Sequence, residues 1–308
     1  MFLKALKILA LVSTTLIFFA ALYLWTPDKS KAELEKTYSS PKNAYVSALG
    51  VNMHYQDTGP SKNVIPILFL HGFGSSLQTW DSWSEALSSE YRVISVDLPG
   101  FGLTGADPSG IYTDQRSVEV LEAFLKALKI PKVVLVGNSM GGKIAWQFTA
   151  RYPNQVSKLV LISPDGYASP GMEYGKKPDV PAIADLYRYF FSKTFLAMNL
   201  KPAYADPNTL NDALVNRYYD LMLAPGVRGA ILGRMQQTVL QDPVPSLASI
   251  QVPTLLIWGE KDAFIPISNS NDYLKVMPNA KRVSLPNIGH LPQEEQPSIG
   301  LAALKDFL

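Results

Sequence analysis

The segment VVLVGNSMGGKIAWQ, residues 133–147, places one serine between glycines where an apolar run meets a helix-like pattern. The apolar run is typical of a strand buried on both faces, and the residues after it have helical spacing. Gly137, Ser139 and Gly141 form the pattern G-x-S-x-G, whose small residues permit a tight strand-to-helix turn. Such a turn exposes the serine hydroxyl beside a helix N-terminus, where backbone N–H groups stabilise developing negative charge.

Strand-like and helix-like segments alternate on both sides of this turn. Apolar and alternating runs predict a hairpin over residues 44–57 and strands over residues 64–70, 91–98, 156–163, 254–259 and 281–285. Helical spacing predicts helices over residues 79–89, 113–128, 140–152, 269–276 and 298–308. The alternation predicts an α/β fold with a mostly parallel sheet covered by helices on both faces.

The alternation stops between residues 166 and 250, which are rich in Pro, Tyr, Met and Phe and contain no strong buried-strand run. We expect this region to be a helical cap inserted into a core of residues 44–165 and 251–308. Its aromatic stretch LYRYFFSKTF, residues 186–195, either presents apolar walls to a substrate or packs in the core, and the second is the more common use of such residues.

The N-terminal residues are apolar and follow positive charge. Lys4 and Lys7 precede an uncharged run over residues 8–25, which is long for a cleaved signal peptide. We therefore expect a membrane anchor over residues 1–27, a polar linker over residues 28–43, and a catalytic domain on the extracytoplasmic side. The alternative is a signal peptide cut near Ala20 or Ala21, which leaves a secreted protein.

Composition excludes several kinds of function. The chain has 308 residues, a formal net charge of +2 and no cysteine. The small charge and the absence of a basic run argue against nucleic-acid binding. Without cysteine there is no disulfide, no thiolate nucleophile and no cysteine zinc site. We expect neither a metal nor an organic cofactor, and the sequence leaves the oligomeric state open.

A serine needs a base to take its proton, and the chain offers three histidines. His54 lies in the predicted hairpin and is expected at the surface. His71 begins the HGFGSS loop, whose conformation it is expected to support. His290 lies in NIGHLPQEEQP, after the last predicted strand, at the sheet edge where such a base is usually carried. We therefore predict His290 as the general base.

A carboxylate must orient that imidazole. Asp262 follows the strand TLLIWG at its carboxyl end and is the favoured candidate. Asp165 follows the preceding strand and is the competitor, whereas Glu260 is expected to face solvent. The glycine-rich loop HGFGSS can direct the backbone N–H of Phe73 at a reacting carbonyl, and the N–H of Met140 would supply a second oxyanion donor.

The motifs HGFGSS, DLPGFGLT, GNSMGG, WGEKD and the GH of NIGHLPQEEQP resemble those of the α/β-hydrolase superfamily, over residues 45–308. GNSMGG is similar to the nucleophile turn of bacterial family V lipases and esterases and of meta-cleavage-product hydrolases. An anchor before such a domain resembles membrane-bound monoacylglycerol lipases. The resemblance implies an eight-stranded sheet with a helical cap and the chain order Ser139, Asp262, His290. Haloalkane dehalogenases and epoxide hydrolases of this fold have an aspartate where Ser139 stands, which argues against both.

These observations predict a serine hydrolase that cleaves small lipophilic carboxylic esters, such as monoacylglycerols or short-to-medium acyl esters. The alternative within enzymes is a C–C bond hydrolase of the meta-cleavage-product type, which would use the same three residues. A non-catalytic hydrolase-like binding protein is disfavoured, because Ser139, Asp262 and His290 are all present.

Overall fold

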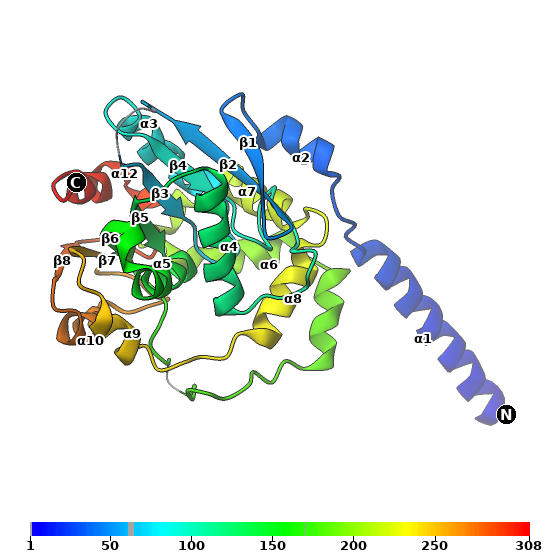
Figure 1. Cartoon of the computed structure of the whole chain (residues 1–308). Helices are drawn as coiled ribbons and strands as arrows, with labels where there is room; N and C mark the ends of the chain where they lie inside the picture. The colour runs from blue at the N-terminus through cyan, green and yellow to red at the C-terminus, as the bar shows by residue number, and fades with distance from the viewer. Residues whose placement is uncertain (1, 61–64, 170) are drawn as a thin grey trace.

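The computed structural model describes residues 2–60, 65–169 and 171–308, and its centre is an eight-stranded sheet (Figure 1). The strand order is β1-β2-β4-β3-β5-β6-β7-β8. Pairings β1–β2 and β2–β4 are antiparallel, and the others are parallel. The strands are β1 (Asn43–Ala48), β2 (Val51–Thr58), β3 (Ile67–Leu70), β4 (Val93–Val96), β5 (Val133–Asn138), β6 (Val156–Ile162), β7 (Thr254–Gly259) and β8 (Ala280–Leu285). The predicted α/β fold with a mostly parallel sheet is confirmed.

Helices cover both faces of the sheet, which explains why the central strands are apolar without alternation. All residues of β3, β4 and β5 are buried. The strand predicted over residues 64–70 begins at Ile67, and Val64 lies outside the described residues. One face packs on α4 (Asp114–Ala127), α5 (Met140–Arg151), α9 (Val244–Ser249) and α10 (Ser270–Val276), and the other on α3 (Asp81–Leu87) and α12 (Pro297–Lys305).

Between β6 and β7 the chain forms the helices that cover the carboxyl ends of the strands (Figure 1). They are η3 (Ala182–Arg188), α6 (Lys193–Leu200), η4 (Lys201–Ala203), η5 (Pro207–Thr209), α7 (Asp212–Met222) and α8 (Val227–Gln237), followed by α9. We refer to residues 166–250 as the cap. The short helices outside the cap are η1 (Leu77–Trp80), η2 (Pro153–Gln155), η6 (Ile267–Asn269) and α11 (Pro292–Glu295).

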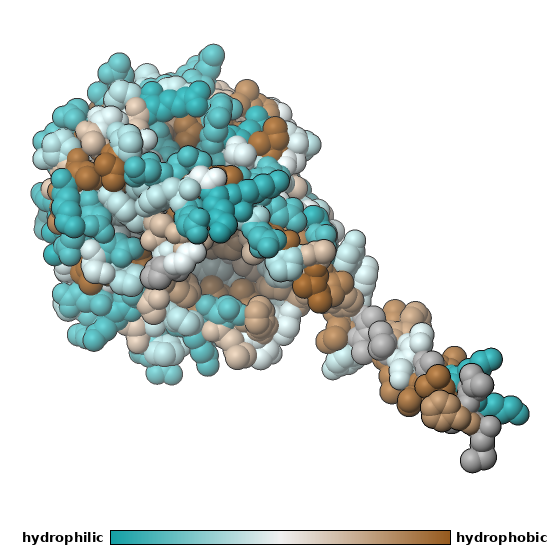
Figure 2. Space-filling view, turned by 90° about the horizontal axis from the view of Figure 1, so that it is seen from below, coloured by the Kyte–Doolittle hydropathy of each residue, from teal (hydrophilic) through white to brown (hydrophobic). Residues whose placement is uncertain are grey.

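The N-terminal helix α1 (Phe2–Leu24) extends away from the rest of the molecule, and Figure 2 shows many apolar residues along it. Among the described residues, no helix is long and apolar enough to cross a membrane. The prediction of a membrane-spanning anchor over residues 1–27 therefore finds no support in the structure.

Residues 28–43 are not the polar linker expected from their charges. They contain α2 (Lys31–Tyr38), whose Leu34 is buried in the main core. The Asp28 carboxylate accepts a 2.6 Å hydrogen bond from Arg228 of the cap, and the backbone N–H of Lys29 donates to the Leu223 carbonyl at 2.8 Å. One buried leucine and these bonds fix a segment whose sequence is otherwise hydrophilic.

Candidate active site

The strand-to-helix turn after β5 holds Ser139 in a strained conformation. Its φ is 55° and its ψ is −120°, a combination that residues with a side chain rarely adopt. A Cβ at Gly137 would lie 2.3 Å from the Gly141 carbonyl oxygen, and one at Gly141 would lie 2.3 Å from the Leu70 carbonyl oxygen. The two glycines are therefore required by packing, and the turn presents Ser139 directly before α5.

His290 and Asp262 lie in contact at the carboxyl end of the sheet. The His290 Nδ1 is 2.8 Å from Asp262 Oδ2, and both residues are nearly buried, with 4% and 6% exposure. The second carboxylate oxygen, Oδ1, accepts backbone N–H bonds from Phe264 and Ile265, each 2.9 Å long. These bonds fix the carboxylate so that it holds one edge of the imidazole.

The main chain of His290 is also held from two directions. Its N–H donates to the carbonyl oxygen of Ala203 in the cap at 2.7 Å. Its carbonyl oxygen accepts a 3.1 Å hydrogen bond from the Nδ2 of Asn138, the residue that precedes Ser139. The cap and the nucleophile turn therefore both position the loop that carries His290.

The two other candidate acids do not contact His290. Asp165 is bound through its backbone N–H to the Ser139 carbonyl at 3.0 Å, and its partly exposed carboxylate lies 3.9 Å from Lys143. Glu260 is exposed, as expected. Among the described residues, the carboxylate that contacts His290 is that of Asp262.

The two residues predicted to supply the oxyanion donors, Phe73 and Met140, lie close to Ser139. Met140 is the first residue of α5, so its backbone N–H is one of those that a helix leaves without an intrahelical partner. Phe73 lies in the loop after β3, which approaches so closely that a Cβ at Gly72 would be 3.2 Å from the Ser139 Cβ. Phe73 and Met140 line the same pocket as Ser139.

His71 is fully buried and supports the loop that contains Phe73. Its Nδ1 lies 2.7 Å from the Gly72 carbonyl oxygen, and its Nε2 accepts the Leu98 N–H at 3.0 Å. Burial lowers the pKa of His71, which favours the neutral ring that can accept this bond.

The prediction that His54 lies at the surface is wrong. His54 is fully buried, with Nδ1 2.7 Å from Asp97 Oδ2 and Nε2 2.8 Å from Asn43 Nδ2. Pairing of β2 with β4 brings it beside Asp97, which follows β4. Asp97 also accepts the backbone N–H groups of Leu77 and Leu103 at 2.7 and 2.8 Å. This second His–Asp pair ties together loops near the site, and both ring nitrogens of His54 are occupied.

Two pockets meet at Ser139. The smaller, which we call the His chamber, has a volume of about 170 Å³ and is lined by Gly72, Phe73, Ser75, Asn138, Ser139, Leu200, Ala203, Tyr218, Phe264, His290 and Leu291. The larger, which we call the apolar chamber, has a volume of about 470 Å³. Its lining is mostly apolar and includes Phe73, Met140, Met172, Pro178, Val180, Met235 and Ile265. Ser139, Asp114, Lys143, Asp165, Arg234 and Thr238 also border it, whereas His290 does not.

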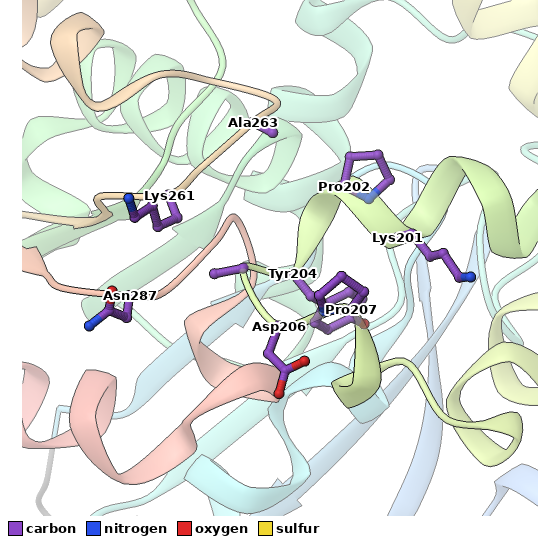
Figure 3. A pocket seen from close by; sticks show the side chains of 9 residues that line it. Lys201, Pro202, Tyr204, Asp206, Pro207, Lys261, Ala263 and Asn287 are labelled. Carbon is purple, nitrogen blue, oxygen red and sulfur yellow. The ribbon is translucent and has the colours of Figure 1, made fainter.

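A third pocket, of about 540 Å³, lies outside both chambers (Figure 3). It is bounded by the cap segment with Tyr204, Asp206 and Pro207 and by Lys261 and Asn287 from loops after β7 and β8. It contains none of the predicted catalytic residues. The aromatic stretch over residues 186–195 lines none of these three pockets: Phe191 is buried against Tyr219, with ring centroids 5.3 Å apart, while Phe195 is exposed.

Two polar residues that line the His chamber, Ser75 and Tyr218, have no distinguishing pattern in the sequence. Tyr218 has an ordinary place in a helix sequence, and Ser75 stands in HGFGSS without a distinguishing pattern. Glu294 lies on α11, just after His290, and its carboxylate accepts a hydrogen bond from the Tyr218 hydroxyl. Within the part of the chain that the structure describes, no group of three or more His, Asp or Glu side chains could hold a metal ion.

Comparison with known proteins agrees with this architecture. The chain is 28% identical over 290 residues to 2-hydroxy-6-oxo-6-(2'-aminophenyl)hexa-2,4-dienoic acid hydrolase of Metapseudomonas resinovorans, covering 91% of this chain and 96% of the relative. It is 27% identical over 283 residues to Lipase 1 of Psychrobacter immobilis, covering 87% and 82%. A solved structure described as a membrane phospholipase A, a bacterial virulence factor, superposes with a TM-score of 0.73 at 25% identity, covering 99% of this chain and 97% of that one.

The family described as alpha/beta hydrolase fold matches residues 65–297. That range includes β3 to β8, the cap and the loops carrying Ser139, Asp262 and His290. The chain belongs to the alpha/beta hydrolase fold family.

Proposed function

We propose that the protein is a serine hydrolase that cleaves carboxylic esters through an acyl-enzyme. The observation that carries the proposal is the arrangement of three residues: strained Ser139 shares the His chamber with His290, which is bound to Asp262 at 2.8 Å. A serine, a histidine and a buried carboxylate in this relationship are the components of nucleophilic acyl transfer.

In the proposed mechanism, the Ser139 Oγ attacks the ester carbonyl while the His290 Nε2 takes its proton. The Asp262 carboxylate accepts a hydrogen bond from the Nδ1–H of His290, which leaves Nε2 free to act as the base and stabilises the imidazolium that forms. The backbone N–H groups of Phe73 and Met140 bind the oxyanion. His290 then protonates the leaving alcohol, and water activated by the same nitrogen hydrolyses the acyl-enzyme.

We propose that the acyl group is lipophilic and occupies the apolar chamber. Methionine, valine, isoleucine and proline side chains line it next to Ser139. The similarity to a lipase and to a membrane phospholipase supports a lipid-like ester, of the monoacylglycerol or short-to-medium acyl type.

The second candidate is hydrolysis of a C–C bond, which the similarity to 2-hydroxy-6-oxo-6-(2'-aminophenyl)hexa-2,4-dienoic acid hydrolase favours. The same serine, histidine and aspartate would serve. We place ester hydrolysis first because the walls of the apolar chamber suit an alkyl chain.

Labelling with a fluorophosphonate probe tests the acyl-enzyme. We expect the wild-type protein and the exposed-surface variant Ser82→Ala to be labelled and Ser139→Ala not to be. A panel of p-nitrophenyl esters, monoacylglycerols and vinylogous diketones then separates the two reactions. A wild-type protein that resists the probe contradicts the mechanism, and turnover of the diketones alone replaces the ester proposal by C–C hydrolysis.

We further propose an extracytoplasmic location, on the basis of Lys4 and Lys7 ahead of an apolar run. Fractionation of cells that produce the full chain tests it, with mass spectrometry of the N-terminus. Recovery in the periplasm or the medium, with or without residues 1–25, supports the proposal, and recovery only in the cytosol contradicts it.

A further inference from the structure

A chain of hydrogen bonds leads from a buried ion pair into the His chamber. Glu294, on α11, forms an ion pair with Arg217 and also accepts the hydroxyl of Tyr204 at 2.6 Å. The Tyr218 hydroxyl donates to the two Glu294 oxygens at 3.1 and 3.2 Å. The Ser75 Oγ donates to the Tyr218 hydroxyl at 3.4 Å. Ser75 and Tyr218 both line the chamber that contains Ser139 and His290.

The direction of these bonds is fixed by chemistry. A carboxylate paired with a guanidinium accepts hydrogen bonds and donates none, so the single Tyr218 proton is used toward Glu294. Tyr218 therefore accepts from Ser75, and the single Ser75 proton is used toward Tyr218. What Ser75 presents to the chamber is an oxygen with lone pairs, which is a hydrogen-bond acceptor.

The chamber containing this acceptor is the one into which the leaving group must go. His290 has to protonate the departing oxygen, so that oxygen lies beside the imidazole. His290 lines the His chamber and not the apolar chamber, and Ser139 lines both. The alcohol part of the ester is therefore assigned to the His chamber and the acyl part to the apolar chamber.

We propose that the enzyme prefers esters of a small alcohol that keeps a second, free hydroxyl, as in a monoester of a diol or triol. This inference rests on the proposed ester hydrolase function. Ser75 binds the free O–H of the leaving alcohol as acceptor, and Tyr218 is a positioning residue that orients Ser75. The small volume of the chamber and its walls, which include Leu200, Ala203 and Leu291, limit the alcohol to a few carbon atoms.

Ser75 therefore favours a hydrogen-bond donor on the alcohol. An ether or a carboxylate in the same place would bring its acceptor oxygen against the Ser75 lone pairs, and the nearby Glu294 carboxylate would add repulsion to a carboxylate. A buried hydroxyl without a partner is costly, whereas the bond to Ser75 contributes about 0.5–1.5 kcal/mol, which corresponds to about two- to twelvefold in kcat/KM.

Three butanoate esters of similar size test the inference on the full-length protein. Glycerol 1-butanoate carries free hydroxyls, propyl butanoate carries none, and 2-methoxyethyl butanoate carries an acceptor in their place. We expect kcat/KM for the glycerol ester to exceed that for both others by about two- to twelvefold, mainly through a lower KM. Equal values for the glycerol and propyl esters, or a preference for the methoxy ester, would overturn the inference.

Substitutions at Ser75 and Tyr218 test whether these residues cause the preference for the glycerol ester. In Ser75→Ala the ratio of kcat/KM between the glycerol and propyl esters is expected to approach one, and in Tyr218→Phe it is expected to fall at least twofold. A general loss of activity cancels in this ratio. Tyr219→Phe is the matched control, because its hydroxyl bonds to the Phe191 carbonyl and lines neither chamber, and it should keep the wild-type ratio.

The possible failures are distinguishable. If the protein hydrolyses the propyl and glycerol esters equally and reacts with the fluorophosphonate, the ester hydrolase function stands and the preference is wrong. An unchanged ratio in Ser75→Ala assigns the preference to another residue and overturns the role of Ser75. If neither ester is hydrolysed and Ser139 is not labelled, the proposed function fails and the preference fails with it.

Discussion

The backbone N–H of His290 donates a 2.7 Å hydrogen bond to the carbonyl oxygen of Ala203, so the cap is bonded directly to the loop that carries the proposed base. Glu295 strengthens this link, because its carboxylate accepts the N–H groups of Gly289 at 2.6 Å and Asp206 at 2.8 Å. Figure 3 shows this cap segment beside the loops that carry Lys261 and Asn287. A displacement of the cap would therefore displace His290.

The buried ion pair between Arg217 of the cap and Glu294 joins the cap to α11, which directly follows the loop that carries His290. Glu294→Leu leaves a cation with 16% side-chain exposure unpaired, and we expect a loss of about 3–5 kcal/mol of unfolding free energy. The double variant Glu294→Leu/Arg217→Met should lose less than the single one, because no charge remains without a partner. Urea unfolding measures both. Lys275→Met, which breaks an exposed pair with Asp272, is the control and should change stability by less than about 1 kcal/mol.

A greater loss in the double variant than in Glu294→Leu would contradict this account. It would mean that Arg217 stabilises the cap through its other contacts, such as its hydrogen bond to the Gln78 carbonyl oxygen, rather than through the charge of Glu294.

The choice of Asp262 over Asp165 as the orienting acid can be tested by matched substitutions. Asp262→Asn removes the acceptor that holds His290 in the tautomer needed for catalysis, so kcat should fall by about 10³- to 10⁴-fold. Asp165→Asn should lower kcat by less than about tenfold, because this carboxylate contacts Lys143 instead of His290. Initial rates on a soluble ester measure both, and the opposite ranking would reassign the acid.

Gly137, two residues before Ser139, has no room for a side chain. In Gly137→Ala the new methyl group would lie 2.3 Å from the Gly141 carbonyl oxygen, and backbone atoms cannot yield as a flexible side chain would. We expect a loss on the order of 3 kcal/mol or more. Gly175→Ala is the comparison: its φ is 75° and the space around it is open, so only the backbone penalty of about 1–2 kcal/mol applies. Equal losses by urea unfolding would show that the contact at Gly137 relaxes without cost.

The Asp97–His54 pair predicts a pH dependence of stability. Burial by itself would raise the pKa of Asp97, but hydrogen bonds from His54 and from the Leu77 N–H hold it below its usual value. The unfolded chain then binds the proton more readily, with a pKa of about 3.9. Asp97 therefore stabilises the fold above about pH 4, and this contribution is lost as the pH falls through the folded pKa.

Asp97→Asn should make unfolding free energy less dependent on pH between about pH 5 and pH 3, where one such group contributes a slope of up to about 1.4 kcal/mol per pH unit. Urea unfolding at several pH values measures the slope. Asp185→Asn alters an exposed carboxylate and should leave the slope as in the wild-type protein. If the two variants behave alike, Asp97 is not the group responsible.

Local pattern was sufficient for the sheet and for the nucleophile turn. Strands buried on both faces need continuous apolar runs, and the turn around Ser139 needs glycines at two fixed positions, so both leave a signature within a few residues. The placement of Asp262 and His290 after successive strands followed from the rule that parallel strands bring their carboxyl ends to one edge.

Contacts between distant segments left no such signature. His54 was expected at the surface because its hairpin alternates, and only the pairing of β2 with β4 buries it against Asp97, 43 residues away. Residues 28–43 are hydrophilic, and their helix is fixed by bonds to a cap some 200 residues further on. Ser75, Tyr218 and Glu294 are separated by 143 and 76 residues and meet only because the cap closes over the sheet. Hydrophobic periodicity and short motifs reflect interactions between residues that are close in the chain. The walls of the His chamber are formed by residues that are distant in the chain, and only the packing of the cap on the sheet brings them together.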